Sequence, residues 1–150
     1  MPPGAEPIIE VQGLSKVYRV AQKSPGLAGS LRSLFRRTLD DLKAPNLKVN
    51  FDPANMLLYD KGDPIRAVEV LGPDIRSVHV KDANRPTAPG QWGEEVPLGR
   101  GQVNIKQFVQ TLKKVGYRGP LCIEREVGDQ EQRLRDVAHG IRYLRECLAE

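Results

Sequence analysis

Three short apolar runs of this sequence each end near a side chain that can bind a metal ion or move a proton: Asp52, His79 and Glu124. Two carboxylates and one imidazole suit a divalent cation such as Mn²⁺, Mg²⁺, Co²⁺ or Zn²⁺. This oxygen-rich set differs from structural zinc sites, which prefer thiolates. The alternative is that the three residues are unrelated, with the acids solvated or capping helices and the histidine held by an ordinary hydrogen bond.

The alternation of side chains along a strand predicts which residues share a face with these three. In a parallel sheet, Asp52, His79 and Glu124 would point to one side, near the carboxyl ends where ligands bind in α/β folds. Five other residues would lie on that side: Asn50, Ser77, Lys81, Cys122 and Glu126. The apolar side chains between them would face the helices. Such a sheet brings the two acids and the histidine to one point.

The elements that would position these residues repeat in the order strand, then helix. The apolar runs are residues 47–52, 75–80 and 120–125, and a helical pattern follows each. The apolar positions of these helices are Ile65, Val68 and Leu71, then Ile105, Phe108, Val109, Leu112 and Val115, and then Leu134, Val137, Ile141, Leu144 and Leu148. Residues 81–103 are expected to form a long loop. Strands that alternate with helices predict an α/β fold with a parallel sheet.

The composition is that of a single globular domain. The chain has 150 residues, of which 39% are hydrophobic and 28% charged, which excludes a disordered or fibrous protein. Residues 1–37 hold six basic and two acidic side chains, whereas residues 38–150 hold 17 of each. The larger part is therefore neutral and has no bulk attraction for nucleic acid or for an anionic membrane.

The cysteine content and the hydropathy bear on the compartment. Two cysteines, Cys122 and Cys147, are too few for a disulfide framework, which favours a reducing environment. No stretch approaches the ~18 apolar residues of a membrane span, and the N-terminus lacks the pattern of a signal peptide. We therefore expect a cytoplasmic protein.

Residues 38–150 resemble the C-terminal part of the sugar phosphate isomerase/epimerase family, which has a xylose-isomerase-like TIM barrel. The resemblance rests on five motifs in the family's order: VNFDPAN (49–55), YDKGDP (59–64), VHVKDA (78–83), WGEEVPLGRG (92–101) and GYRGPLCIERE (116–126). It implies that the chain holds the last three βα units of a (β/α)₈ barrel. A complete barrel needs around 250 residues, so the resemblance implies a partial barrel.

The resemblance also implies the chemistry of the site. In this family Asp, His and Glu on these strands bind a divalent metal, which matches Asp52, His79 and Glu124. The metal holds adjacent oxygens of a sugar or sugar phosphate and stabilises the enediolate that forms when a proton is removed. Glu124 would be both a metal ligand and the acid/base. The family's other metal-binding glutamate, its second acid/base, has no counterpart in the chain, so the isolated chain is expected to be inactive.

Four further residues are implied to lie near the substrate: Asn55, Lys81, Arg85 and Trp92. Arg85 follows the second strand, where related epimerases place an arginine that contacts substrate, and Asn55 stands where some relatives have a histidine. Lys81 could reach a substrate oxygen, or pair with Asp82 or Glu124 instead. Trp92 could wall the sugar pocket or cover the mouth of the barrel.

The first segment of the chain has a different character. Residues 8–20 and 31–37 resemble the start of an ABC transporter ATP-binding subunit, but the chain contains no phosphate-binding loop of the form GxxxxGK[ST]. Without those backbone amides ATP binding is not expected. We therefore divide the chain into a non-homologous N-terminal segment, residues 1–37, and a partial barrel, residues 38–150.

Three functions compete on this basis. The first is a metal-dependent sugar (phosphate) isomerase/epimerase that is inactive as this truncated chain. The second is a non-catalytic truncated or fused fragment that folds alone or associates with other chains through its open sheet edges. The third is a DNA-repair nuclease of the same superfamily, and the chain's two histidines argue against its many metal ligands.

Overall fold

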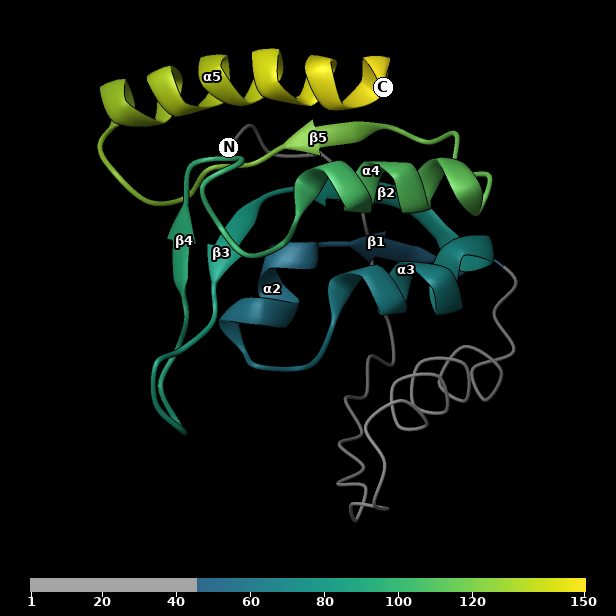
Figure 1. The fold of residues 1–150 in the computed structure, drawn as a ribbon, viewed down its shortest axis with the longest axis horizontal. Helices are drawn as coiled ribbons and strands as arrows, with labels where there is room; N and C mark the ends of the chain where they lie inside the picture. Colours follow the sequence, from purple (N-terminus) through teal and green to yellow (C-terminus); the bar gives the residue numbers. More distant parts are fainter. Residues whose placement is uncertain (1–45) are drawn as a thin grey trace, which may run out of the picture.

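The computed structural model describes residues 46–150, and their centre is a parallel three-stranded sheet (Figure 1). The strands are β1 (Val49–Phe51), β2 (Ile75–Val80) and β5 (Leu121–Ile123), in the order β1-β2-β5. Both strand pairs are parallel, which confirms the α/β prediction. The N-terminal segment with the ABC-like motif lies outside the described residues.

Helices follow each of the three strands. They are α2 (Pro53–Leu58), α3 (Pro64–Leu71), α4 (Ile105–Lys114) and α5 (Gln130–Ala149), together with a short 3-10 turn, η1 (Gly72–Asp74). The sequence predicted α3, α4 and α5 but not α2. Both α2 and α3 begin with an aspartate followed by proline, and the carboxylates of Asp52 and Asp63 accept backbone N–H groups of the first turn. These caps stabilise helices that are otherwise short.

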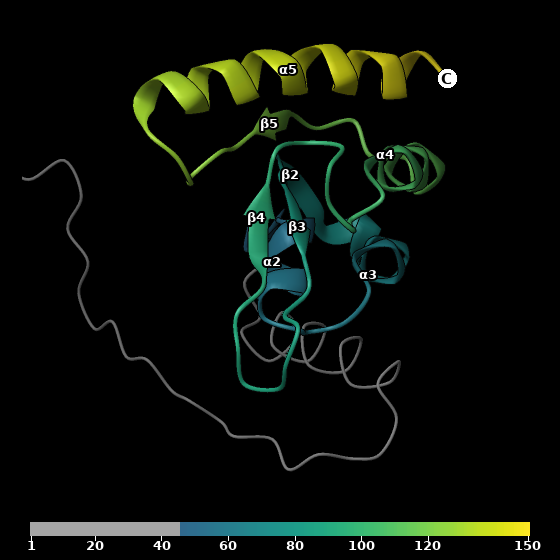
Figure 2. The ribbon, with the colours of Figure 1, turned by 60° about the vertical axis from the view of Figure 1, so that its left-hand side comes forward.

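The core lies between the sheet and the helix pair α3 and α4, which are side by side in Figure 2. Alternation along the strands directs Phe51, Val78 and Val80 into this core, where each is buried. Phe51 stacks on Phe108 of α4 with their ring centroids 6.0 Å apart. The opposite face of the sheet keeps its polar side chains, as the alternation predicts.

The predicted loop of residues 81–103 is wrong in part, because it contains an antiparallel hairpin. Strand β3 (Asp82–Asn84) pairs with β4 (Glu94–Val96). The loop after β4 is organised by the buried Asp82 carboxylate, which accepts four backbone N–H groups, from Ala83, Gly99, Gly101 and Val103. Both strands are short and polar, so they carry no apolar alternation by which a strand is usually recognised.

The predicted apolar face of α5 is also wrong in part. The buried residues of α5 are Asp136, Gly140, Leu144 and Cys147, whereas Leu134, Ile141 and Leu148 are exposed. The helix runs beside β5 and α4 (Figure 1). It is turned so that Asp136 contacts Arg125, which lies two residues after β5. Cys147 of this helix is part of the buried core. No helix within residues 46–150 has the length and apolarity needed to cross a membrane.

Candidate metal centre

The structure brings Asp52, His79 and Glu124 together. Asp52 follows β1, His79 is the penultimate residue of β2, and Glu124 follows β5. One ligand atom from each residue lies within 4.8 Å of the others. The parallel register that pairs His79 with Cys122 places Glu124 just beyond the end of its strand, and its N–H donates to the Val80 carbonyl (3.3 Å). The three elements thus meet at the carboxyl edge of the sheet.

Asp52 divides its two carboxylate oxygens between structure and site. Oδ1 accepts the N–H of Asn55 at 3.1 Å and so caps α2. Oδ2 is buried and has no hydrogen-bond partner, although the Lys81 ammonium lies 3.4 Å away. Burial raises the pKa of this carboxyl, against the opposing effects of the Asn55 N–H and Lys81. Buried polar atoms usually have a partner. Oδ2 lies beside an imidazole and a second carboxylate, so a metal ion bound to all three would supply the missing partner.

Polar neighbours orient His79. Nε2 lies 3.2 Å from the side-chain nitrogen of Asn50, and the Asn50 oxygen accepts the Ser77 hydroxyl at 2.5 Å. Because the amide nitrogen is a donor, Nε2 is the acceptor and Nδ1 carries the proton of the neutral ring. Nδ1 lies 3.1 Å from Glu124 Oε2, so it donates there. Asn50 and Ser77 lie on the same face of the sheet as His79, and their hydrogen bonds therefore fix the plane of the imidazole.

Lys81 is the central cation of the site. Its side chain is 2% exposed, and Nζ lies 2.5 Å from Glu126, 2.9 Å from Glu124 and 3.4 Å from Asp52. Burial disfavours the ammonium, but hydrogen bonds with Glu126 and Glu124 outweigh this and raise the pKa of Lys81. The hydrogen bond between Lys81 and Glu124 also lowers the pKa of Glu124. Of the predicted partners Lys81 therefore pairs with Glu124, and Asp82 is occupied by loop N–H groups.

The other predicted substrate residues lie apart from the triad, except Asn55. Arg85 donates to Asp60 Oδ1 (3.0 Å) and to the Gly62 carbonyl (2.7 Å). Trp92 is 73% exposed and meets the Tyr59 ring edge-on, with centroids 5.0 Å apart. Asn55 lies beside the site, in the first turn of α2.

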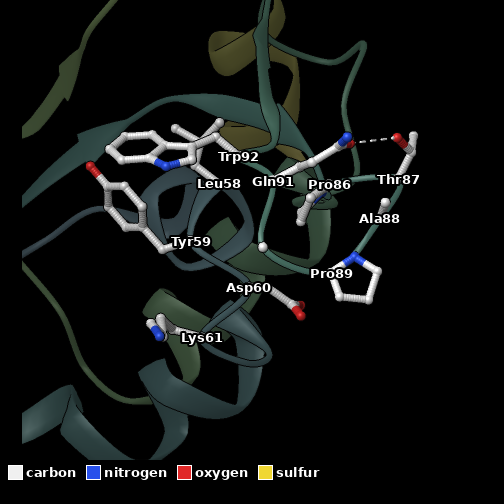
Figure 3. A pocket seen from close by; sticks show the side chains of 11 residues that line it. Leu58, Tyr59, Asp60, Lys61, Pro86, Thr87, Ala88, Pro89, Gln91 and Trp92 are labelled. Carbon is white, nitrogen blue, oxygen red and sulfur yellow. Dashed lines mark hydrogen bonds between the residues drawn. The ribbon is translucent and has the colours of Figure 1, made fainter.

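Trp92 and Tyr59 line a separate pocket of about 630 Å³ between the C-terminal end of α2 and the hairpin loop (Figure 3). None of the triad residues lines this pocket. Asp52 precedes the first residue of α2, and the indole lies at the opposite, C-terminal end of that helix.

A buried ion-pair network that the sequence did not predict supports the two glutamates. Arg125 lies between Glu124 and Glu126, and its guanidinium bonds Glu95 of β4 (2.7 Å) and Asp136 of α5 (2.8 Å). Glu95 also accepts the Glu126 N–H at 3.0 Å. The signal was present in the sequence, since alternation turns Arg125 away from the polar face, where a buried charge needs partners.

The sequence model of the family described as "Xylose isomerase-like TIM barrel" matches residues 23–147. The chain belongs to this family. The match covers most of the chain, from before β1 to the last turn of α5, and it begins within the segment that precedes residue 38. No part of these comparisons supports the ABC transporter resemblance of residues 8–37.

Three relatives illustrate the similarity. The "Putative L-ribulose-5-phosphate 3-epimerase SgbU" of Escherichia coli K12 is 30% identical over 73% of this chain and 38% of its own. The "L-ribulose-5-phosphate 3-epimerase UlaE" of Salmonella typhi is 30% identical over 73% and 36%. A crystal structure of a xylose isomerase domain protein from Planctomyces limnophilus is 40% identical, with a TM-score of 0.74 over 77% of this chain and 43% of that one. The chain thus spans about two fifths of each relative's length.

Proposed function

We propose that this chain is the metal-binding part of an isomerase or epimerase of sugars or sugar phosphates. The observation that carries the proposal is the meeting of Asp52, His79 and Glu124 at the edge of the sheet, with ligand atoms within 4.8 Å of one another. The names of two relatives support the substrate class, because both describe epimerases of a sugar phosphate. The family relationship supports the same class of reaction.

The donor set fits a hard or borderline divalent cation. Asp52 Oδ2, a ring nitrogen of His79 and a carboxylate oxygen of Glu124 would hold Mn²⁺, Mg²⁺, Co²⁺ or Zn²⁺. When bound, such a cation would polarise the carbonyl oxygen of a sugar and favour loss of a proton from the adjacent carbon. A cation at Nδ1 of His79 would take the place of the Nδ1 proton and of its hydrogen bond to Glu124 Oε2, and Oε2 would keep its contact with the Lys81 ammonium at 2.9 Å.

Glu124 is the base that we propose. A general base has to be ionised at working pH, and the Lys81 ammonium holds the pKa of Glu124 below its usual range. Glu124 would take the proton from the carbon beside the carbonyl, which leaves an enediolate, and would return the proton in the reverse direction. Glu95 helps to position this residue, because it binds the Arg125 guanidinium and the Glu126 N–H and so fixes the two residues that follow Glu124.

The described part of the chain does not enclose this site. The side chains of His79 and Glu124 are about one third exposed, at 34% and 35%, and Cys122 on the same face of the sheet is exposed. Water therefore reaches the position that an enediolate would occupy. We propose that the 150-residue chain binds metal but does not turn over sugar by itself.

Metal binding is tested by calorimetric titration of Mn²⁺ into the 150-residue chain and two histidine variants. His79→Ala should weaken binding by at least about tenfold, because it removes one of three ligands. His139→Ala is the matched control, because His139 lies on α5 and its ring contacts the Leu98 carbonyl (3.1 Å) and not the triad. Equal effects of the two substitutions would refute the proposed site.

A further inference from the structure

The ammonium of Lys81 occupies the space between the carboxylates of the candidate metal centre. It lies within 3.4 Å of both acidic ligand candidates, Asp52 and Glu124, and within 2.5 Å of Glu126, which is not part of the triad. The lysine side chain is 2% exposed, whereas that of Glu126 is 65% exposed. The protein therefore supplies a buried cation of its own to this site.

Two physical effects follow from this position. Three carboxylates close together repel one another, and an ammonium among them lowers that repulsion and holds the oxygens at fixed distances. A divalent cation bound to Asp52 and Glu124 would lie near the same ammonium, and like charges at such a distance repel strongly where water is excluded. Lys81 thus stabilises the metal-free site and opposes the metal.

We propose that Lys81 is a resident counter-cation that holds Asp52 and Glu124 in ligating positions before metal binds and weakens the affinity for that metal. This inference rests on the proposed metal site. Glu126 has the complementary part, because its carboxylate draws the ammonium toward the exposed rim of the site. The balance between these two residues sets how readily the site takes up and releases its cation.

The proposal predicts opposite effects for two substitutions on Mn²⁺ affinity. Lys81→Met keeps an unbranched side chain of similar length but removes its charge, so Mn²⁺ should bind about tenfold more tightly or better. Glu126→Gln removes a negative charge and frees the ammonium to approach Asp52 and Glu124, so Mn²⁺ should bind a few-fold more weakly. A residue that merely held the fold would weaken binding when it is replaced, and so would a direct ligand.

Thermal unfolding gives a second measurement. Without metal, Lys81→Met should melt below the wild type, because three carboxylates are left without their partner. Saturating Mn²⁺ should raise its melting temperature by more than that of the wild type, because tighter binding to the folded state adds more stability. Circular dichroism in EDTA would establish that the variant is folded.

The experiment is a calorimetric titration of MnCl₂ into the wild-type chain, Lys81→Met, Glu126→Gln and His79→Ala. Tighter binding by Lys81→Met with weaker binding by Glu126→Gln supports the proposal. Equal or weaker binding by Lys81→Met overturns it, even where His79→Ala confirms the metal site. If Lys81→Met is unfolded, Glu126→Gln decides, and unchanged or tighter binding by it overturns the proposal. An unchanged His79→Ala refutes the metal site itself, and so does the absence of Mn²⁺ binding in all four proteins.

Discussion

Single residues of this chain carry two tasks at once, and Asp52 shows this most clearly. One oxygen caps α2 and the other is buried without a hydrogen-bond partner. A cap can be supplied by asparagine as well as by aspartate, but a divalent cation prefers the charged oxygen. The two tasks can therefore be separated by substitution.

Asp52→Asn should lose metal affinity and keep the fold. We expect Mn²⁺ binding to weaken by at least about tenfold, because the ligand charge is lost, while the free energy of unfolding without metal changes by less than about 1 kcal/mol. Asp52→Ala should lose the cap as well and cost about 1 kcal/mol more. Calorimetry and urea denaturation measure the two effects. Equal stability of Asn and Ala variants would contradict the division of roles.

At the scale of elements, the sequence predicted the three strands of the parallel sheet and three of the four helices, because apolar spacing records the burial of a face. It also predicted that Asp52, His79 and Glu124 meet, because strand alternation and parallel pairing suffice for that. The hairpin β3–β4 and the buried face of α5 were missed. Both are held by buried polar groups, Asp82 and Asp136, most of whose partners lie 11 to 21 residues away in the sequence and leave no periodic signal.

The Asp82 carboxylate should be essential to the loop after β4. Two of its four hydrogen bonds, from the N–H groups of Ala83 and Val103, are buried and the other two are partly buried. A buried donor left unpaired costs about 1–3 kcal/mol. We expect Asp82→Ala to lower the free energy of unfolding by about 3 kcal/mol or more. Glu69→Ala is the control, because Glu69 is an exposed partner of Arg66 on α3 whose loss should cost less than about 1 kcal/mol. Similar losses in urea denaturation would contradict this role.

The network of Arg125 should make stability depend on pH. The Arg125 hydrogen bond lowers the pKa of Asp136 from its ordinary 3.8. A carboxyl with a lowered folded pKa contributes stability that is present above 3.8 and is lost as the pH falls through the folded value. Unfolding free energies measured between pH 7 and pH 2 should therefore fall less steeply in Asp136→Asn than in the wild type. Glu131→Gln, at an exposed position of α5, should keep the wild-type slope. If Asp136→Asn also kept the wild-type slope, the Arg125 network would not be the source of the pH dependence.

At the scale of the whole molecule, the described sheet has one covered and one open face. Helices α3 and α4 cover the apolar face, whereas Asn50 and Cys122 are exposed on the other. In the TIM barrel family to which the chain belongs, that second face of the sheet lines the interior of a closed barrel. The chain spans about two fifths of its relatives, so the remaining strands would come from other βα units.

Those considerations predict that the isolated 150-residue chain has no measurable epimerase activity. Proton transfer on both faces of a sugar carbon uses two positioned groups, and the loss of one such group costs about 10²–10⁴-fold in rate. The open face also leaves any enediolate in water, where electrostatic stabilisation is weak. An assay with L-ribulose 5-phosphate and Mn²⁺ should therefore show no turnover by the chain alone. Fusion to the N-terminal βα units of a relative, or their addition as a separate chain, should produce activity that Glu124→Gln abolishes. Metal-dependent turnover by the chain alone, lost in Glu124→Gln, would show that residues 1–150 already hold both proton-transfer groups.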